Sequence, residues 1–269
     1  MCIKSLITFL KQDRPIVRLE VTEVRGSTPR DTGATMFVSS TESNGTIGGG
    51  QLEYLAVKKA QQNLVSKEKD GTLDIFLGPE IGQCCGGRVK ITFKTLDQAA
   101  RKIVVAQVLA DEQALPKVYI FGAGHVGRAL ADQFQHLPVH CILVDSRIEE
   151  LNLSRARVER RVSTLPEAEV RSAPAGSAFI VLTHDHALDF LVTGEALART
   201  DAVWVGMIGS ATKKAKFTSF ARAEWPALAT DDLNCPIGAT RSRDKRPSVI
   251  AAAVVSAVIT AITCDTTIR

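Results

Sequence analysis

The chain has 269 residues, of which 45% are hydrophobic and 23% charged, and its formal net charge is +4. This length suggests two domains or one large one, and the composition is ordinary for a globular protein. So small a net charge gives no reason to expect nucleic-acid binding, and aromatic residues, at 5%, are too few for stacking platforms on single strands.

The cysteines and the apolar stretches indicate an intracellular protein. None of the six cysteines forms a C-x-x-C pair, and no histidine lies at zinc-ligand spacing from Cys84 and Cys85. Their scatter is typical of a reducing compartment. The N-terminal stretch lacks the features of a signal peptide, and the apolar run 249–262 is shorter than the ~20 residues that span a bilayer. We therefore expect a cytoplasmic protein without a membrane segment, in which this run forms a buried helix.

The first part of the chain, residues 1–96, predicts a mixed α+β domain. Residues 5–10 predict a short helix and residues 51–65 a longer one. Alternating apolar positions predict strands, which we place at residues 16–24, 35–39, 73–77 and 89–93. A further helix is expected within residues 97–115, where it would link this domain to the next.

Two polar loops of this domain carry candidate ligand contacts. Residues 26–33, GSTPRDTG, include Arg30, which would face a ligand, although the residues alone favour a long hairpin loop. Residues 45–50, GTIGGG, open a predicted helix, where free N–H groups and the helix dipole favour an anion close to Gly48, Gly49 and Gly50. An ordinary glycine turn competes with this interpretation. The loop is not a Walker motif, because no Gly-Lys-Ser/Thr follows.

The stretch 77–89, LGPEIGQCCGGRV, places Cys84 and Cys85 on a glycine-rich loop between two predicted strands. Proline and glycine exclude a regular helix there. Such a loop brings backbone N–H groups and a sulfur atom close to a bulky ligand. A hairpin with buried, inert cysteines explains the same residues equally well, because free cysteine is among the most buried residue types.

The second part, residues 116–269, predicts a Rossmann-like, doubly wound parallel sheet. A strand at 118–121 leads into GAGHVG and a helix at 128–135, and a second strand, 139–144, ends at Asp145, 23 positions after Gly122. This G-x-G-x-x-G lies in the strand–turn–helix setting of a dinucleotide fold. The candidate nucleotide contacts are Gly122, Gly124, His125, Gly127 and Asp145. Arg147 leaves NADP open as well as NAD.

Two more polar clusters follow predicted strands of this domain, at 179–182 and 202–205, where doubly wound sheets bind ligands. The candidate residues at this edge are His184, Asp185, His186, Gly209 and Ser210. The two histidines would act as metal ligands or as a general base, or would cap the helix expected at 187–197. The residues favour capping, because no third ligand matches. The basic runs 155–161 and 241–246 are typical of solvated loops, or would meet a phosphate or an acidic partner.

Taken in order, these motifs resemble the xanthine dehydrogenase accessory protein family, the XdhC/CoxI group. The resemblance covers nearly the whole chain. Its specificity lies in the order of the motifs, which are GSTPR, GGGQLE, GQCCGG, GAGHVG, THDHALD and CPIG. The Gln-Cys-Cys-Gly-Gly form resembles the xanthine dehydrogenase branch, whereas the wider group needs only Cys-Gly-Gly.

The resemblance implies a chaperone that takes part in purine catabolism and is not itself an enzyme. Such a protein binds the molybdenum cofactor transiently, protects it while its terminal sulfido ligand is installed, and delivers it to xanthine dehydrogenase. A cysteine desulfurase is the implied second partner, and a homodimer is expected. The competing hypothesis is an NAD(P)-dependent oxidoreductase, based on the Rossmann-like domain.

The resemblance also directs the cofactor to particular residues. Molybdenum with a dithiolene is a soft centre that suits thiolate, and consecutive residues of an extended segment point to opposite sides. We therefore expect Cys85, which belongs to the wider Cys-Gly-Gly pattern, to contact the molybdenum, with Cys84 as the second candidate. The full set of expected cofactor contacts is Arg30, Gly48, Gly49, Gly50, Gln83, Cys84, Cys85, Gly86 and Gly87.

Overall fold

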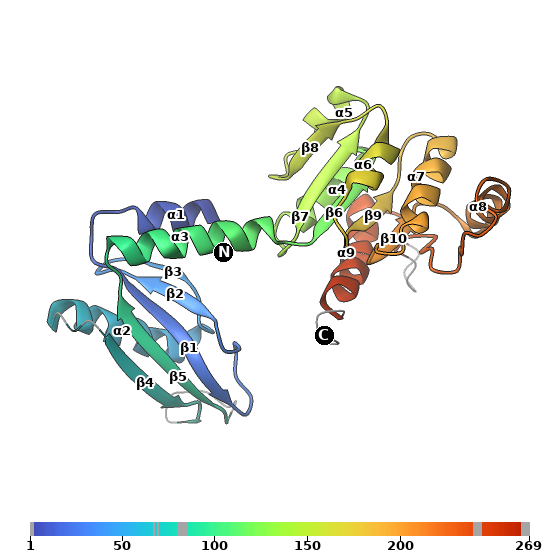
Figure 1. Ribbon diagram of the computed structural model, residues 1–269. Coiled ribbons are helices and arrows are strands. Elements are labelled where there is room, and N and C mark those ends of the chain that lie inside the picture. The colour runs from blue at the N-terminus through green and yellow to red at the C-terminus, as the bar shows by residue number, and fades with distance from the viewer. Residues whose placement is uncertain (1–2, 67, 69, 80–85, 239–243, 265–269) are drawn as a thin grey trace. The chain divides into compact units, whose positions relative to one another are not determined.

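The computed structural model describes residues 3–66, 68, 70–79, 86–238 and 244–264. The chain divides into two units, residues 1–112 and residues 113–269, which are described separately (Figure 1). We call them unit 1 and unit 2.

Unit 1 is built on an antiparallel sheet with the strand order β3-β2-β1-β5-β4. Its strands are β1 (Val17–Arg25), β2 (Thr35–Val38), β3 (Ser43–Gly45), β4 (Asp70–Phe76) and β5 (Arg88–Thr95). Helix α2 (Gly50–Ser66) packs Leu52, Ala56 and Ala60 against buried residues of the central strands, such as Leu19 and Ile91. The alternating apolar residues of the strands therefore face one helix-covered core.

Helices α1 (Ile3–Leu10) and α3 (Gln98–Gln113) run side by side in unit 1 (Figure 1). Leu6, Phe9 and Leu10 of α1 form a second core with Ile16, Phe37 and Leu96, and one face of α3 packs against it through residues Ala100, Val104, Val105 and Val108. The helix expected to be a linker over residues 97–115 is thus packed on the core of unit 1, because its apolar face needs a partner.

Unit 2 contains a parallel sheet with the strand order β10-β9-β6-β7-β8. Its strands are β6 (Lys117–Phe121), β7 (His140–Asp145), β8 (Glu159–Val162), β9 (Ala178–Val181) and β10 (Trp204–Met207). Its helices are α4 (His125–Phe134), α5 (Ile148–Asn152), α6 (Pro166–Ser172), α7 (His186–Ala198), α8 (Ala211–Glu224) and α9 (Pro247–Cys264). The near-continuous apolar character of its central strands follows from burial on both faces.

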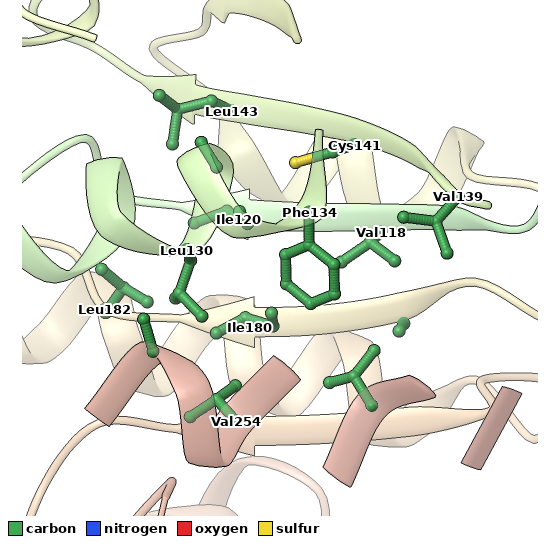
Figure 2. Close-up of a cluster of buried hydrophobic side chains, with 14 of the residues drawn as sticks. Val118, Ile120, Leu130, Phe134, Val139, Cys141, Leu143, Ile180, Leu182 and Val254 are labelled. Atoms are coloured by element: carbon green, nitrogen blue, oxygen red, sulfur yellow. The ribbon is translucent and has the colours of Figure 1, made fainter. Parts of the chain in front are cut away.

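Each face of this sheet has its own core. On one face, α4, α5 and α9 contribute side chains such as Leu130, Leu151 and Val254; Figure 2 shows Leu130 and Val254 lying against Ile120 and Ile180 of the central strands. On the other face, α6, α7 and α8 cover an aromatic layer that includes Phe179. This arrangement is the doubly wound fold predicted for unit 2. The helices and antiparallel sheet of unit 1 are the mixed α+β domain predicted there, so the predicted fold class is confirmed for both units.

Helix α9 is long and apolar enough, by length and composition, to cross a membrane. It corresponds to the run expected as a buried helix, but only Ala251, Val254 and Val258 are fully buried. Other apolar residues, such as Val255 and Ile259, are partly buried against the core beside α4. The fully exposed positions between them hold serine, alanine, threonine and, at the end, cysteine, so the helix turns its large apolar side chains to the sheet.

Four short elements were not expected from the sequence: β3, α5, β8 and α6. Strand β8 has the sequence ERRV and belongs to the run interpreted as a solvated basic loop. Its arginines suit an edge position, where Arg161 pairs with Glu159 and with Glu169 of α6. The other three are three to seven residues long, too short for hydrophobic periodicity to appear.

Candidate ligand sites in the two units

Three glycine-containing segments of unit 1 come together beyond the ends of its strands. Ser27 forms an isolated bridge with Gly86. A Cβ atom on Gly87 would lie 2.2 Å from the carbonyl oxygen of Ser27, and one on Gly48 would lie 2.5 Å from Cγ of Pro29. We call the residues 26–30, 46–50 and 86–87 the glycine surface. It unites three of the motifs that the sequence singled out, because only glycine permits such close backbone approach.

The turn before α2 is bonded to a carboxylate of the chain itself. Gly48, Gly49 and Gly50 all have positive φ, 134°, 73° and 60°, which L side chains rarely adopt. Oε2 of Glu53 accepts hydrogen bonds from the N–H groups of Ile47 (3.2 Å) and Gly49 (3.1 Å) and from the hydroxyl of Thr46 (2.6 Å). The prediction of an external anion at this turn remains a prediction, and such a ligand would meet donors that Glu53 does not use.

The loop that carries the two cysteines is closed by backbone hydrogen bonds at its base. The N–H of Gly86 donates to the carbonyl of Leu77 at 2.9 Å, and that of Leu77 donates to the carbonyl of Gly87 at 2.7 Å. Gln83, Cys84 and Cys85 lie outside the described residues, so their expected contacts stay predictions. Gly86, which directly follows Cys85 in the chain, has a φ of +68°, and no atom of the described residues lies within 4 Å of where a Cβ would stand.

Exposed charges adjoin the glycine surface on β1, β4 and β5. A shallow depression is lined by Glu23, Arg25, Asp74, Arg88 and Lys90. Arg88 makes two hydrogen bonds with Asp74, at 2.7 and 2.8 Å, and these lower the pKa of Asp74. The predicted contact Arg30 is exposed and has no hydrogen bond or ion pair within the described part of the chain. This charged depression was not predicted from the sequence. The only feature of the sequence that indicates it is the presence of charged residues at alternating positions of the strands.

In unit 2 the three glycines of the GAGHVG turn differ in why glycine is required. A Cβ on Gly122 would lie 2.2 Å from the carbonyl oxygen of Leu182, and one on Gly127 would lie 1.9 Å from that of Gly122. Gly124 has an ordinary φ of −65° and nothing within 4 Å of its missing Cβ. The first and third glycines are therefore needed for packing, whereas the space beside the second is open. His125, the first residue of α4, is exposed.

Asp145, at the end of β7, is buried and holds the GAGHVG turn. Its Oδ2 accepts from the N–H of Ala123 at 2.8 Å and from Arg147 at 2.9 Å, and its Oδ1 accepts from the backbone N–H and Nε of Arg147 at 2.9 and 3.0 Å. Burial alone would raise the pKa of Asp145, but these hydrogen bonds outweigh it and leave the pKa below its usual value. The carboxylate is therefore ionised at neutral pH.

A recess lies at the carboxyl edge of the parallel sheet, beside Asp145. Its lining residues come from the loops after β6, β7, β8 and β9, and they include Gly122, Asp145, Ser146, Ser163, Thr164, Thr183 and His184. Two candidate nucleotide residues, Gly122 and Asp145, thus share one recess with His184 of the second polar cluster. The strand order reverses between β6 and β9, which makes this edge the topological switch point of the sheet, and doubly wound folds bind their ligands at such a point.

The polar cluster after β9 is organised by two aspartates. Asp185 caps α7 by accepting from the N–H groups of Ala187 (2.7 Å) and Leu188 (3.2 Å), and these bonds lower its pKa. His184 and His186 on either side are exposed. No group of three histidine, cysteine or acidic residues suited to a metal occurs among the residues that the structure describes. Helix capping is therefore observed at this position, though by Asp185.

The second aspartate, Asp189, joins the loops after β9 and β10. It is 1% exposed, accepts from the N–H and the hydroxyl of Thr183 at 2.8 and 2.7 Å, and forms an ion pair with Lys213 of α8. Ser210 caps α8 by accepting from the N–H of Lys213 at 3.3 Å. Gly209 is exposed, and a Cβ there would lie 2.7 Å from the side chain of Lys213. Asp189 and Lys213 were not among the residues predicted from the sequence. The one feature that could have indicated them is that each places a charged residue in the first turn of a helix that packs on the sheet.

Two of the described cysteines of the parallel-sheet unit, Cys141 and Cys235, are poor nucleophiles. Burial raises the pKa of Cys141 to about 12. Burial also raises the pKa of Cys235, which precedes Pro236 in the CPIG turn, although Lys213 and Lys214 lie close enough to oppose the shift. Cys264 is exposed at the end of α9. Neither Cys141 nor Cys235 is activated as a reactive cysteine would be.

Comparison with known proteins gives matches over both units. The family model described as the XdhC Rossmann domain matches residues 118–258, and the model described as the XdhC and CoxI family matches residues 9–75. The uncharacterised protein YqeB of Escherichia coli K12 is 25% identical over 145 residues, which are 53% of this chain and 24% of that protein. The chain thus spans about a quarter of the length of this curated relative.

A solved structure extends the likeness to nearly the whole fold. A crystal structure described as a xanthine dehydrogenase from Bacillus halodurans superimposes with a TM-score of 0.81, over 97% of this chain and 96% of that chain. The two sequences are 18% identical, so this match shows a common fold and no more.

Proposed function

The chain belongs to the XdhC and CoxI family of xanthine dehydrogenase accessory proteins, and from this membership we propose that it is a chaperone for the molybdenum cofactor. It binds the cofactor as cargo, protects it while the terminal sulfido ligand is installed, and delivers it to xanthine dehydrogenase. The observation that carries the proposal is the glycine surface, where three motifs of unit 1 meet beside the loop that contains Cys84 and Cys85.

The chemistry of this surface fits the cargo. No atom of the described residues lies within 4 Å of where a Cβ would stand on Gly49 or Gly86, which leaves room for a bulky pterin at the backbone there. Thiolate suits a soft molybdenum–dithiolene centre. The pterin phosphate needs a cation or free N–H donors, and Glu53 already takes those of Ile47 and Gly49. Exposed Arg30 is therefore the residue that we assign to the phosphate, together with N–H groups that Glu53 leaves free.

Cys85 is the residue that we assign to the molybdenum. It directly precedes Gly86, whose backbone bridges to Ser27 within the glycine surface. Cys84 is the second candidate. A cargo must be released again, so one thiolate contact with a few weaker hydrogen bonds serves the function better than a closed set of ligands.

The protein acts without turnover of its own in this proposal. Its partners are xanthine dehydrogenase and a cysteine desulfurase, and it works as a homodimer in the cytoplasm, in purine catabolism. The sulfido ligand comes from the desulfurase, and this chain contributes binding, protection and transfer.

The test compares single cysteine variants purified from a host that makes the cofactor. Cys85→Ala should lose bound molybdenum and pterin and should fail to mature xanthine dehydrogenase, while its circular dichroism spectrum and melting temperature stay unchanged. Cys264→Ala removes an exposed thiol in the other unit and should behave like the wild type. Molybdenum is measured by mass spectrometry, the pterin by the fluorescence of its oxidised form, and maturation by xanthine turnover.

A Cys85→Ala variant that keeps its cofactor and matures the enzyme normally would show that the thiolate assignment is wrong. Loss of cofactor in Cys84→Ala alone would move the contact to the neighbouring residue. Equal loss in Cys264→Ala would mean that the effect is not specific to the loop.

An oxidoreductase that uses NAD(P) is the second candidate function. The open position at Gly124 and the recess beside Asp145 favour a bound nucleotide in unit 2. A redox enzyme would also reduce NAD⁺ or NADP⁺ when offered an oxidisable substrate such as xanthine, or would consume NADH or NADPH when offered an artificial electron acceptor. Binding without such turnover would leave the chaperone proposal in place.

A further inference from the structure

We propose that the recess of unit 2, with Gly124 and Arg147 close in the chain to its lining residues Gly122 and Asp145, binds a dinucleotide whose ribose carries a 2′-phosphate, as in NADP. We also propose that this site discriminates against the same nucleotide with a free ribose diol. The site belongs to a different unit from the glycine surface and does not depend on the proposed cofactor function. Three observations carry the inference, and they concern Gly124, Asp145 and Arg147.

Gly124 marks where a ligand meets the backbone. Its φ of −65° is open to any residue, and a Cβ there would touch nothing within 4 Å. Neither backbone conformation nor internal packing therefore requires glycine at this position, unlike at Gly122 and Gly127. In the fold's G-x-G-x-x-G turn, the second glycine is where the pyrophosphate approaches the chain. The missing side chain leaves that space for a ligand.

The carboxylate that would recognise a ribose diol is already saturated. A carboxylate offers about four acceptor positions, and Asp145 receives four hydrogen bonds, one from Ala123 and three from Arg147. With the side chain 3% exposed, no acceptor position remains for the 2′- and 3′-hydroxyl groups. A free diol would first have to displace the guanidinium of Arg147.

Arg147 instead presents donors to an anion. Its Nε and one terminal nitrogen are bonded to Asp145, while the other terminal nitrogen has no partner in the described part of the chain, and the side chain is 37% exposed. Of the acidic residues whose charges act on Arg147, Glu149 is exposed and has no ion pair in the described part of the chain, whereas the charge of Asp145 is cancelled by the ion pair. Glu150 of the adjacent helix is also neutralised, by Arg128 at 2.6 Å.

The recess supplies further donors for phosphate oxygens and ribose. The hydroxyl groups of Ser146, Ser163 and Thr164 line it, and none of them makes a side-chain hydrogen bond to another described residue. Hydroxyl groups donate to phosphate as well as accept from sugar. Arg128 helps to hold the GAGHVG turn by donating to the carbonyl of Ala123 at 2.6 Å.

The experiment measures binding of four probes to the full chain, freed of nucleotide, by isothermal titration calorimetry. The probes are NADP⁺, NAD⁺, adenosine 2′,5′-bisphosphate and AMP. The 2′-phosphorylated member of each pair should bind at least about tenfold more tightly, the effect of one charge-assisted hydrogen bond. Arg147→Ala should abolish that ratio, whereas Arg155→Ala, which removes an exposed arginine with no bond in the described chain, should preserve it.

Gly124→Ala separates binding from folding. It should weaken both dinucleotides while the melting temperature stays within a few degrees of the wild type. Four results would each overturn the inference: no binding of NADP⁺ at millimolar concentration, NAD⁺ bound as tightly as NADP⁺, an unchanged ratio in Arg147→Ala, or unchanged affinity in Gly124→Ala. None of these bears on molybdenum binding in unit 1.

Discussion

Two glycine-rich turns open helices in this protein, one in each unit, and both are bonded to a carboxylate of the chain itself. In unit 1, Glu53 lies in the first turn of the same helix and accepts from two N–H groups of the turn, those of Ile47 and Gly49. In unit 2, Asp145 comes from the next strand and is neutralised by Arg147. A glycine-rich turn before a helix therefore does not by itself indicate a ligand.

What distinguishes the two turns is why glycine is there. Gly48, Gly49 and Gly50 need positive φ, so their presence follows from the backbone alone. Gly124 has no such need. Glycine that neither backbone nor packing requires is the more informative signal, and it points to unit 2 for the nucleotide. In unit 1 the feature that indicates a ligand is the glycine surface, where three loops come together.

The largest loss of stability is expected when Asp189 is replaced, because both this carboxylate and its ion-pair partner Lys213 are largely buried. Asp189→Ala leaves the Lys213 ammonium, whose side chain is 12% exposed, without its counter-charge. Breaking a buried pair from one side should lower the free energy of unfolding by about 4 kcal/mol. Asp231→Ala, at an exposed aspartate of the same unit, should change it little. Urea unfolding followed by fluorescence of Trp204 and Trp225, both in unit 2, measures this, and equal effects of the two variants would contradict the account.

The next largest loss of stability is expected at Gly127, and it tests the difference between Gly127 and Gly124 of the GAGHVG turn. Gly127→Ala forces a Cβ to within 1.9 Å of the carbonyl oxygen of Gly122 and should cost about 3 kcal/mol of stability through overpacking. Gly124→Ala should cost less than about 1 kcal/mol, since its φ suits alanine. Thermal unfolding of the two variants side by side gives the answer. A Gly124→Ala protein as unstable as Gly127→Ala would remove the argument for a ligand at that position.

Asp145 predicts a pH dependence for unit 2. Its pKa is lowered in the folded state, so its stabilisation is complete above the unfolded value near ~3.9 and is lost as pH falls through the folded pKa. Asp145→Asn should be less stable than the wild type by about 2 kcal/mol at neutral pH, the cost of lost charge-assisted bonds. The difference should shrink below pH ~4. A difference that stays constant from neutral to acid pH would exclude this role of the carboxylate.

The smallest effect belongs to the turn of unit 1. Glu53→Gln keeps an acceptor for the N–H groups of Ile47 and Gly49 but removes the charge, which should cost about 1 kcal/mol. Amide hydrogen exchange at these two residues should accelerate, as NMR can measure. Unchanged exchange would mean that the carboxylate does not close the turn.

The sequence predicted the parts of the fold that periodicity and glycine spacing encode. Long elements such as α2, and the strand–turn–helix around Gly124, carry strong patterns, so their positions could be found. Elements such as β8 could not, because an edge strand with the sequence ERRV has no alternation of apolar residues. Side-chain partners across long separations, such as Asp189 with Lys213, arise from packing and leave no local signature.

For the candidate sites, the sequence indicated segments that the structure brings together, but it did not indicate the hydrogen bonds within them. It grouped Asp145 with the glycines of its turn, and the recess contains both Asp145 and Gly122. It could not tell that Arg147 saturates that carboxylate, or that Glu53 occupies the turn at Gly48–Gly50. A carboxylate that is hydrogen-bonded within the chain cannot be told apart, in the sequence, from one that is free to bind a ligand.

The central claim is that this chain carries the molybdenum cofactor. The most direct measurement is the molybdenum and pterin content of the full-length protein, purified from a host that makes the cofactor and from one that cannot. The account predicts molybdenum and pterin together, in equal amounts up to one of each per chain, only from the first host. Protein from the cofactor-producing host that contains neither would contradict it.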